Sequence, residues 1–474
     1  MTPSSLVRVR SRRVWTGAPG GPVPSVVTVR SGIIERVDLA PGQPTPGVPE
    51  TDLGDLLLLP GFIDVHAHLT MPADGRPYEI VHAAGDDELL ATGRANALRH
   101  LAGGVTTVRD NGARGDLGVR LREELAAKAP APRVLAAGRP LTPPGGHFHF
   151  CGGVAATPAD VRDAVHRLAD EGVDHVKVMA SGGGTVGSRP EESTYGLDHL
   201  AAAVSAARAR GLRVAAHCRG TDSLRLALRA GVDCVEHVDF LTRVPGAEAV
   251  VAYDPEVGAM LRDQGTWISM TLQAGGYDTL LGLRADPARL RRLERYFADK
   301  LAILGRLLAD GLEGQIVIST DAGPSDTQFG RFPLGLALAA QAGWHPSSAL
   351  HAVTSRAARA AGLAHLTGQI APGLSADLVA VHPALLDPAP APADVRWVMT
   401  CGHEFPLARP PRELANGRSV AGGLRRLRGI RTLEDAFGGA LPAPQVSADF
   451  SAVTAAHPRP DFKRQILAAV AGTV

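Results

Sequence analysis

Short apolar runs alternate with longer Ala-, Leu- and Arg-rich segments through the middle of the chain. The eight runs are Leu56–Leu59, Gly104–Val108, Arg133–Ala137, His175–Met179, Arg213–Ala216, Cys234–Glu236, Trp267–Met270 and Ile316–Ser319. Helix-like segments between them include 158–171, 197–210, 221–230 and 288–310. Runs this short are typical of buried strands, whereas the longer segments have helical length. The pattern therefore predicts eight β/α units in succession.

Eight consecutive β/α units predict an α/β protein built on a TIM-type (β/α)8 barrel. We expect the barrel to occupy residues 59–362 and to be closed by a helix over 347–361, with Pro346 at its start. A doubly wound parallel sheet is the alternative that the same pattern allows. In both folds the functional side chains gather at the carboxyl ends of the strands.

The two flanking segments have a different pattern. Residues 1–58 contain strand-like stretches at 7–10, 26–29 and 33–37, separated by Gly, Pro and Ser, with a Gly/Pro-rich loop at 41–49. Similar short stretches return within 363–404, at 368–370 and 377–381. We expect 1–58 and 363–404 to form one small β-sandwich domain together. Residues 405–474 are a C-terminal extension whose basic patch, 425–431, is typical of a solvated helix face.

Composition narrows the classes of function. The chain has 474 residues with 49 Lys and Arg against 48 Asp and Glu, a balance that argues against electrostatic binding to nucleic acid or membrane. Its four cysteines are scattered, and neither a signal-peptide core nor an 18-residue apolar run is present. These features predict a cytoplasmic protein that acts on a small molecule, and they leave a homo-oligomer open.

Candidate metal ligands stand where the apolar runs end. His66 and His68 are one residue apart, so in an extended chain both side chains project from the same face. Two imidazoles placed in this way supply half of a zinc-type ligand set. His217, His237 and Asp321 follow three of the later runs. Taken singly, each histidine would more often be an ordinary core or loop residue.

Lys177 is the least expected of these residues, because it lies inside the apolar run Val176–Met179. Burial of an unpaired ammonium costs several kcal/mol, so this side chain needs a compensating interaction. Reaction with CO2 would turn the ammonium into an anionic carbamate that can bridge two metal ions.

The order His-x-His, Lys, His, His, Asp over eight β/α units resembles the amidohydrolase superfamily of metal-dependent hydrolases. The local sequence is similar to the branch that contains Xaa-Pro dipeptidases, other metallo-carboxypeptidases and imidazolonepropionase-like proteins. The segments that carry the resemblance are 60–68, 104–110, 145–147, 177–183, 236–237 and 319–323, and the similarity extends from about residue 5 to 400.

The resemblance implies a centre with two divalent metal ions, most often zinc. His66, His68 and Asp321 would hold one ion, His217 and His237 the other, and carboxylated Lys177 would bridge them. The ions would lower the pKa of a shared water and polarise the scissile carbonyl. Asp321 would accept the water proton and pass it to the leaving amine. The implied activity is hydrolysis of an amide or peptide C–N bond.

The resemblance also suggests how a substrate carboxylate is recognised. His147 occupies the histidine position of the Gly-Gly-His loop that contacts such substrates in the family. A tyrosine commonly follows the His217 position, but this chain has Cys218 and Arg219 there. Arg219 is a candidate for a charge-assisted contact with a carboxylate, and a solvent-facing or supporting role is the alternative.

Other readings of the site remain open. A cyclic amide, imidazolone or lactone hydrolase could use the same centre, and a metal-free scaffold could keep the barrel without catalysis. The glycines at 182, 184 and 187 match a dinucleotide-binding spacing, but a loop follows them in place of the required helix. A second His-x-His, at 147–149, follows a Pro/Gly-rich turn, so a further metal site there is not expected.

Overall fold

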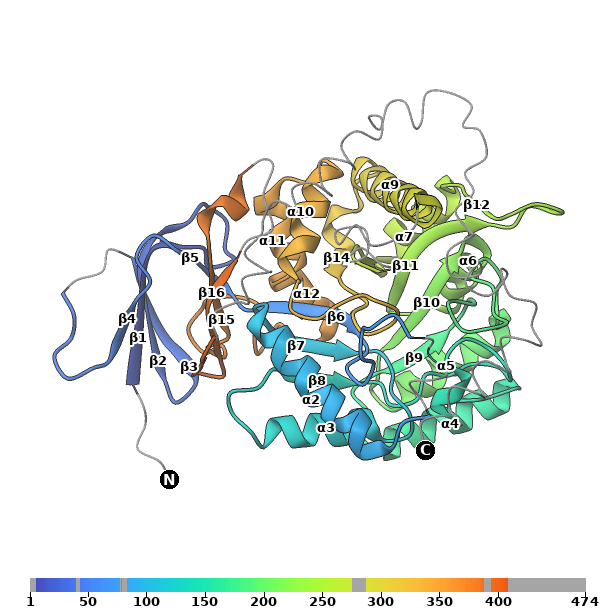
Figure 1. Cartoon of the computed structure of the whole chain (residues 1–474), viewed down its shortest axis with the longest axis horizontal. Coiled ribbons are helices and arrows are strands. Elements are labelled where there is room, and N and C mark those ends of the chain that lie inside the picture. The colour runs from blue at the N-terminus through green and yellow to red at the C-terminus, as the bar shows by residue number, and fades with distance from the viewer. Residues whose placement is uncertain are drawn as a thin grey trace.

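The computed structural model describes residues 6–39, 43–76, 78, 83–274, 287–387 and 394–407. The predicted basic patch at 425–431 lies outside these residues. Figure 1 shows a β-rich part on one side and a larger α/β part beside it. None of the described helices is long and apolar enough to cross a membrane.

The β-rich part is one eight-stranded sheet that draws on both flanking segments. Strand order is β17-β16-β15-β5-β1-β2-β3, with β4 paired to β1. The strands are β1 (Leu6–Val14), β2 (Val23–Arg30), β3 (Ile33–Leu39), β4 (Glu50–Asp52), β5 (Leu57–Pro60), β15 (Leu378–Val381), β16 (Val395–Thr400) and β17 (His403–Phe405). Val27, Ile34, Leu58, Leu378 and Trp397 contribute to its buried apolar cluster.

One predicted strand belongs to this sheet and not to the α/β part. The run Leu56–Leu59 forms most of β5, which pairs with β1 and β15. A separate strand, β6 (Phe62–Ala67), carries His66. Pro60 ends the first strand, and a Cβ at Gly61 would collide with the Thr106 side chain, so no larger side chain fits there. The prediction that this run is the strand leading to His66 and His68 was therefore wrong, because β6 is that strand.

The α/β part contains two parallel sheets. One has the order β6-β7-β8 and the other β14-β13-β11-β10-β9. Their strands are β7 (Val105–Asp110), β8 (Arg133–Ala136), β9 (Val176–Met179), β10 (Val214–Gly220), β11 (Cys234–Thr242), β13 (Trp267–Thr271) and β14 (Ile316–Ser319); β12 (Val250–Val251) pairs antiparallel with β11. Single parallel bridges, Ala67 with Ala322 and Leu141 with Val178, connect the two sheets.

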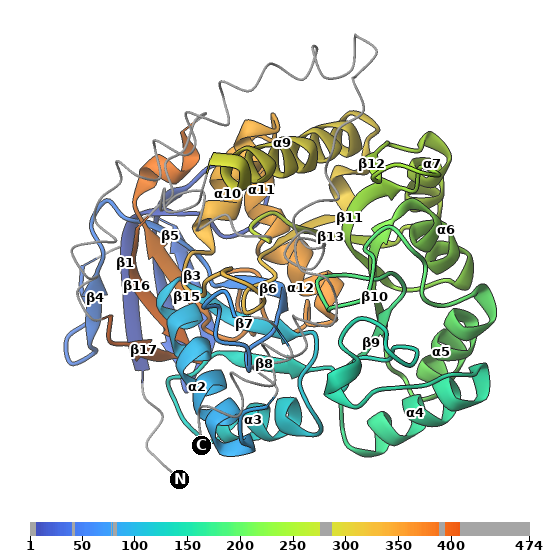
Figure 2. The ribbon, with the colours of Figure 1, turned by 45° about the vertical axis from the view of Figure 1, so that its right-hand side comes forward.

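Helices lie around the outside of these strands (Figure 2). They are α2 (Asp86–Ala102), α3 (Leu117–Ala126), α4 (Pro158–Asp170), α5 (Leu197–Ala209), α6 (Thr221–Ala230), α7 (Pro255–Gln264), α9 (Pro287–Ala309), α10 (Pro333–Gln341), α11 (Pro346–Ala352) and α12 (Ser355–Ala361). The four helices predicted between 158 and 310 are confirmed to within one residue at each end. Helix α4 illustrates the local cause, because Thr157 and Asp160 form a capping box and Pro158 starts the helix.

The predicted closing helix over 347–361 is divided into α11 and α12. Thr354 lies at the break with non-helical angles, φ −133° and ψ −101°. Its hydroxyl donates to the carbonyl of Leu350 at 2.6 Å, which satisfies a carbonyl at the end of α11. A side chain that hydrogen-bonds the local backbone competes with helix continuation, and apolar periodicity alone does not reveal it.

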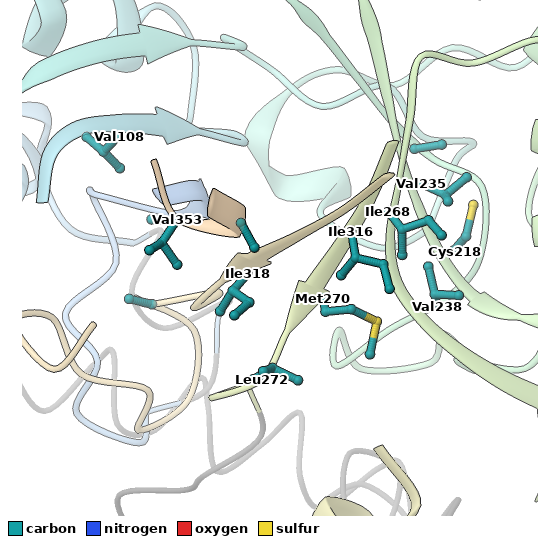
Figure 3. Close-up of a cluster of buried hydrophobic side chains, with 14 of the residues drawn as sticks. Val108, Cys218, Val235, Val238, Ile268, Met270, Leu272, Ile316, Ile318 and Val353 are labelled. Atoms are coloured by element: carbon teal, nitrogen blue, oxygen red, sulfur yellow. The ribbon is translucent and has the colours of Figure 1, made fainter. Parts of the chain in front are cut away.

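The core between the strands is apolar and closely packed. Val235, Ile268, Met270, Ile316 and Ile318 from three neighbouring strands meet there (Figure 3), and each is at most 1% exposed. This core fixes the strands from which the polar side chains of the site project.

Candidate metal centre and substrate pocket

All eight side chains predicted as site residues line one pocket. They are His66, His68, His147, Lys177, His217, Arg219, His237 and Asp321. Tyr78, Phe148, Met179, Gly183, Gly184, Ala274, Tyr296 and Pro324 complete the lining. Strands β6, β9, β10 and β11 carry His66, Lys177, His217 and His237, whereas His68 directly follows β6 and Asp321 follows β14.

His66, His68 and Asp321 form a group that could hold a metal ion, with their candidate ligand atoms within 4.8 Å of one another. Asp321 Oδ1 lies 3.2 Å from His66 Nε2 and 3.6 Å from His68 Nε2. Asp321 has a left-handed backbone, φ +57°, and its N–H donates to the His66 carbonyl at 2.8 Å. This turn directs the carboxylate back toward the two histidines, and such strain in a non-glycine residue is concentrated at functional sites.

Backbone carbonyls determine which ring nitrogen two of the histidines present to the pocket. His68 Nδ1 lies 3.1 Å from the Gly112 carbonyl, and His217 Nε2 lies 3.0 Å from the Gly182 carbonyl. A carbonyl only accepts, so these nitrogens carry the proton in neutral imidazole. The lone pairs are therefore on His68 Nε2 and His217 Nδ1.

His237 places an unsatisfied nitrogen in the same cluster. Its ring centroid lies 4.4 Å from that of His217 and 4.9 Å from that of His66. Nδ1 bonds the Thr271 hydroxyl at 2.9 Å, whereas the buried Nε2 has no hydrogen-bond partner among the described residues. Buried polar atoms nearly always have a hydrogen-bond partner or a metal ion bound to them. His237 Nε2 is therefore suited to bind a metal ion.

Burial keeps these histidines neutral. It lowers the pKa of His66, His147, His217 and His237 well below the ordinary value, and neighbouring cationic groups act in the same direction. Neutral rings retain the lone pair that metal coordination requires. Burial also raises the pKa of the Asp321 carboxyl, against the opposing effect of His68 and Lys177.

Lys177 is fully buried on β9 and forms an ion pair with Glu236 of β11. Burial, followed by the charge of Arg109, lowers the pKa of this lysine to about 7. This shift favours the neutral amine relative to an exposed lysine, whereas the ion pair with Glu236 favours the ammonium.

Glu236 also contacts the candidate ligands, although it was not among the residues predicted from the sequence. Its Oε1 accepts hydrogen bonds from Arg109 at 3.0 Å and Asn111 at 2.7 Å, and its Oε2 lies 3.1 Å from His66 Nδ1. The signal was present, because a glutamate at the end of an apolar run needs buried partners. The partners Arg109 and Asn111 are 127 and 125 residues away along the chain and could not be identified.

The glycine-rich loop after β9 packs against His147. A Cβ at Gly183 would collide with the His147 ring, so only glycine allows this approach. His147 Nδ1 bonds the Thr185 hydroxyl of the same loop at 2.8 Å. The next helix, α5, begins only at Leu197. The loop thus positions His147 and does not form a dinucleotide-binding turn.

Arg219, at the end of β10, belongs to a buried charge network. Its Nε donates to Asp239 Oδ2 at 2.5 Å, and Lys300 of α9 donates to Asp239 Oδ1 at 2.8 Å. Burial opposes ionisation of Asp239, but the two cations outweigh it and lower its pKa. Both cations also lie over the Tyr296 ring, 5.6 and 5.7 Å from its centroid. Asp239, Tyr296 and Lys300 had no recognisable signal in the sequence.

A continuous chain of polar contacts joins this network to the histidine cluster. Lys300 donates to the Thr271 hydroxyl at 3.0 Å, and the same oxygen contacts His237 Nδ1 at 2.9 Å. The chain from Arg219 through Asp239 and Lys300 therefore ends on a candidate metal ligand.

Comparisons with known proteins agree with this geometry. The profile described as the Amidohydrolase family matches residues 57–424. The chain belongs to the amidohydrolase family. This confirms the resemblance drawn from the sequence, and the predicted class of enzyme agrees with it.

Individual relatives are more distant. An uncharacterized protein of Mycobacterium tuberculosis is 29% identical over 243 residues, which span 50% of this chain and 58% of that protein. The imidazolonepropionase of Cereibacter sphaeroides is 27% identical over 423 residues, covering 81% of this chain and 96% of the relative. A solved Xaa-Pro dipeptidase with bound methionine superposes with a TM-score of 0.73 at 22% identity, covering 85% and 100% of the two chains. This last similarity shows the fold.

Proposed function

We propose that the protein is a metal-dependent hydrolase that cleaves an amide or peptide C–N bond in a small, carboxylate-bearing molecule. Substrates of the dipeptide, carboxypeptidase or N-acyl amino acid type fit this description. The observation that carries the proposal is the convergence of His66, His68 and Asp321 with Lys177 and His237 on one pocket. Membership of the amidohydrolase family supports it.

The donors present fit two divalent ions, for which zinc is the proposed identity. His66, His68 and Asp321 would hold one ion, His217 and His237 the other, with carboxylated Lys177 between them. Neutral imidazoles and a carboxylate are ligands that Zn²⁺ favours. The unsatisfied Nε2 of His237 supports this assignment, because this nitrogen can bind a metal ion. The lowered pKa of Lys177 also supports it, because carboxylation requires the neutral amine.

When bound, the ions would supply a water of lowered pKa and polarise the scissile carbonyl. Asp321 would accept the proton of that water and deliver it to the leaving nitrogen. A carboxylate beside the water can act first as the general base and then as the general acid. In the proposed mechanism no Ser or Cys nucleophile is required.

His147 and Arg219 are the proposed substrate contacts. They line the pocket with the metal-ligand candidates, and Arg219 is held by Asp239. A guanidinium fixed in this way can make a charge-assisted hydrogen bond with a carboxylate without losing much side-chain freedom. The tyrosine common in the family at this position would thus be replaced by a cation.

The proposed architecture places this site at the mouth of a closed (β/α)8 barrel over residues 59–362. The bridges Ala67 with Ala322 and Leu141 with Val178 support closure, since each links the edges of the two parallel sheets. We infer that 1–58 and 363–404, which share the single eight-stranded sheet, form one small β domain and that 405–474 are an extension. A cytoplasmic location remains part of the proposal.

A cyclic amide, such as an imidazolone, is the second candidate substrate. The similarity to imidazolonepropionases over about four-fifths of the chain favours it. The same centre would open a ring C–N bond, and a lactone would be opened in the same way.

A substrate screen with zinc-loaded protein tests the proposal. N-acyl amino acids and dipeptides are compared with lactams, imidazolones and lactones of similar size, with chelator-treated protein as the control. We expect metal-dependent hydrolysis of carboxylate-bearing amides. Exclusive turnover of ring substrates would favour the second candidate, and a protein that binds no metal would favour a scaffold.

A further inference from the structure

Glu236 lies at the point where four strands of the α/β part meet. Its carboxylate contacts His66 of β6, Arg109 of β7 and Lys177 of β9, while Glu236 itself is on β11. Asn111, directly after β7, is the fourth partner. Glu236 is completely buried and lines no part of the pocket among the described residues. Its contacts are therefore with the protein and not with substrate.

We propose that Glu236 is a positioning residue that sets the orientation and proton position of His66 and holds Lys177 in place for metal binding. This inference rests on the proposed metal centre. The proposed role requires a group that can accept hydrogen bonds at both of its oxygens, as a carboxylate can.

The four groups that face the Glu236 carboxylate are all donors. Oε1 accepts from the Arg109 guanidinium at 3.0 Å and from the Asn111 amide nitrogen at 2.7 Å. Oε2 lies 3.1 Å from His66 Nδ1 and within ion-pair distance of the Lys177 nitrogen, although neither contact has hydrogen-bond geometry among the described residues. A glutamine of the same shape has one acceptor oxygen and one NH2 group. In either orientation its NH2 would face donors, so the isosteric replacement cannot satisfy this position.

The contact with His66 determines which ring nitrogen can bind a metal ion. A carboxylate only accepts, so a neutral His66 ring that hydrogen-bonds Oε2 carries its proton on Nδ1. The lone pair is then on Nε2, which lies 3.2 Å from Asp321 Oδ1 inside the candidate metal group. Carboxylates that orient metal-binding histidines in this way typically change metal affinity about 10- to 100-fold when they are removed.

The contact with Lys177 is compatible with both forms of the lysine. The free amine has N–H groups, and the nitrogen of a carboxylated lysine keeps one hydrogen. Glu236 can therefore accept from Lys177 in either form.

The anchoring of Glu236 itself is built into strand β7 and the residues after it. Arg109 also donates through Nε to the Val65 carbonyl at 2.7 Å, which links the support of Glu236 to strand β6. His175 Nε2 lies 2.9 Å from Asn111 Oδ1, which keeps the amide nitrogen of Asn111 directed at Glu236. Arg109 and Asn111 thus hold Oε1 of Glu236, whereas Oε2 contacts His66 and Lys177.

The test compares zinc binding in the wild type, Glu236→Gln, and the double variant Glu236→Gln with Asn111→Asp. Affinity is measured by competition with a chelating dye, and zinc per chain by elemental analysis. We expect about 10- to 100-fold weaker binding in Glu236→Gln. The double variant should recover part of the affinity, because the Asn111→Asp change offers an acceptor to the glutamine NH2 while Arg109 still faces it. Equal binding in wild type and Glu236→Gln would overturn the inference, whereas absence of zinc from the wild type would overturn the proposed function.

A second measurement tests the inference without any substitution at Glu236. Histidine-selective ¹⁵N NMR of the metal-free wild type reports the tautomer of each ring, with His66→Gln used for assignment. We expect His66 as the Nδ1–H form. A predominant Nε2–H form would contradict the role of Glu236 even if Glu236→Gln fails to fold.

Discussion

Arg219 and Asp239 are joined by a 2.5 Å hydrogen bond between Nε and Oδ2, and both side chains are buried beside the pocket. Lys300 contacts the other oxygen of the same carboxylate. Within this network of described residues one carboxylate lies between two cations, so positive charges outnumber negative ones. An anionic substrate group is the natural complement of that excess.

Arg219→Gln should raise KM for carboxylate-bearing substrates more than for the matching carboxamides. A hydrogen bond to a charged group contributes about 1.5–3 kcal/mol, so the expected change is roughly 10- to 100-fold in KM. Steady-state kinetics on each acid and amide pair measure the difference. Arg243→Gln, at an arginine with a 66% exposed side chain, is the matched control. An equal loss on acids and amides would exclude carboxylate recognition by Arg219.

Lys177→Ala should lose metal and activity together. Without the bridging group, two cations would face each other with less negative charge between them, so we expect a loss of metal affinity of about tenfold or more. Short carboxylic acids such as acetate should restore part of both, since they can occupy the space of the carbamate. Elemental analysis with and without the acid measures the effect. Metal content equal to that of the wild type would contradict a bridging role.

Asp321→Asn should retain most of the metal and lose most of the turnover. The amide keeps an oxygen for coordination but cannot accept the water proton, and loss of general-base catalysis costs about 10²- to 10⁴-fold in kcat. The kcat and the zinc content of the same preparation are compared. A kcat near that of the wild type would remove Asp321 from proton transfer.

Asp299→Asn should stabilise the protein at pH 8 but not at pH 4. Burial raises the pKa of the Asp299 carboxyl on α9 from 3.8 to about 7, and its Oδ2 has no hydrogen-bond partner among the described residues. Well below pH 3.8 both the folded and unfolded states are protonated, so the group has no effect. As pH rises to about 7 the unfolded state ionises first, which lowers folding stability.

Thermal unfolding at several pH values measures this contribution of Asp299. The expected gain in Tm for the asparagine variant is at least about 1 °C at pH 8 and falls toward zero near pH 4. The exposed variant Asp263→Asn serves as the control, with a side chain that is 74% exposed. A gain that is independent of pH would show that ionisation of Asp299 is not its cause.

The sequence predicted local features well because they depend on neighbouring residues. Helix α6 occupies the predicted residues 221–230, and its C-cap Gly231 has the left-handed φ of +79° expected at a helix end. The candidate ligands were found because strand ends and the His-x-His spacing are visible along the chain. The division between β5 and β6 was missed, since Pro60 and Gly61 read equally well as the end of one strand.

The supporting residues of the site could not be predicted. Glu236 depends on Asn111, 125 residues away, and Lys300 reaches Asp239 from a helix 61 residues later. Such contacts arise only when distant elements pack, and a lysine on a helix is otherwise typical of solvent exposure. The spacing of the candidate metal ligands is visible in the sequence. The residues that orient these ligands follow no recognisable spacing.

We propose that six side chains, at or just after the ends of five strands, bind two divalent ions. Elemental analysis of the full-length protein, purified after expression with added zinc, tests it directly. We expect about two zinc ions per chain, and a much lower content in Lys177→Ala. Fewer than about one ion per wild-type chain under these conditions would contradict it.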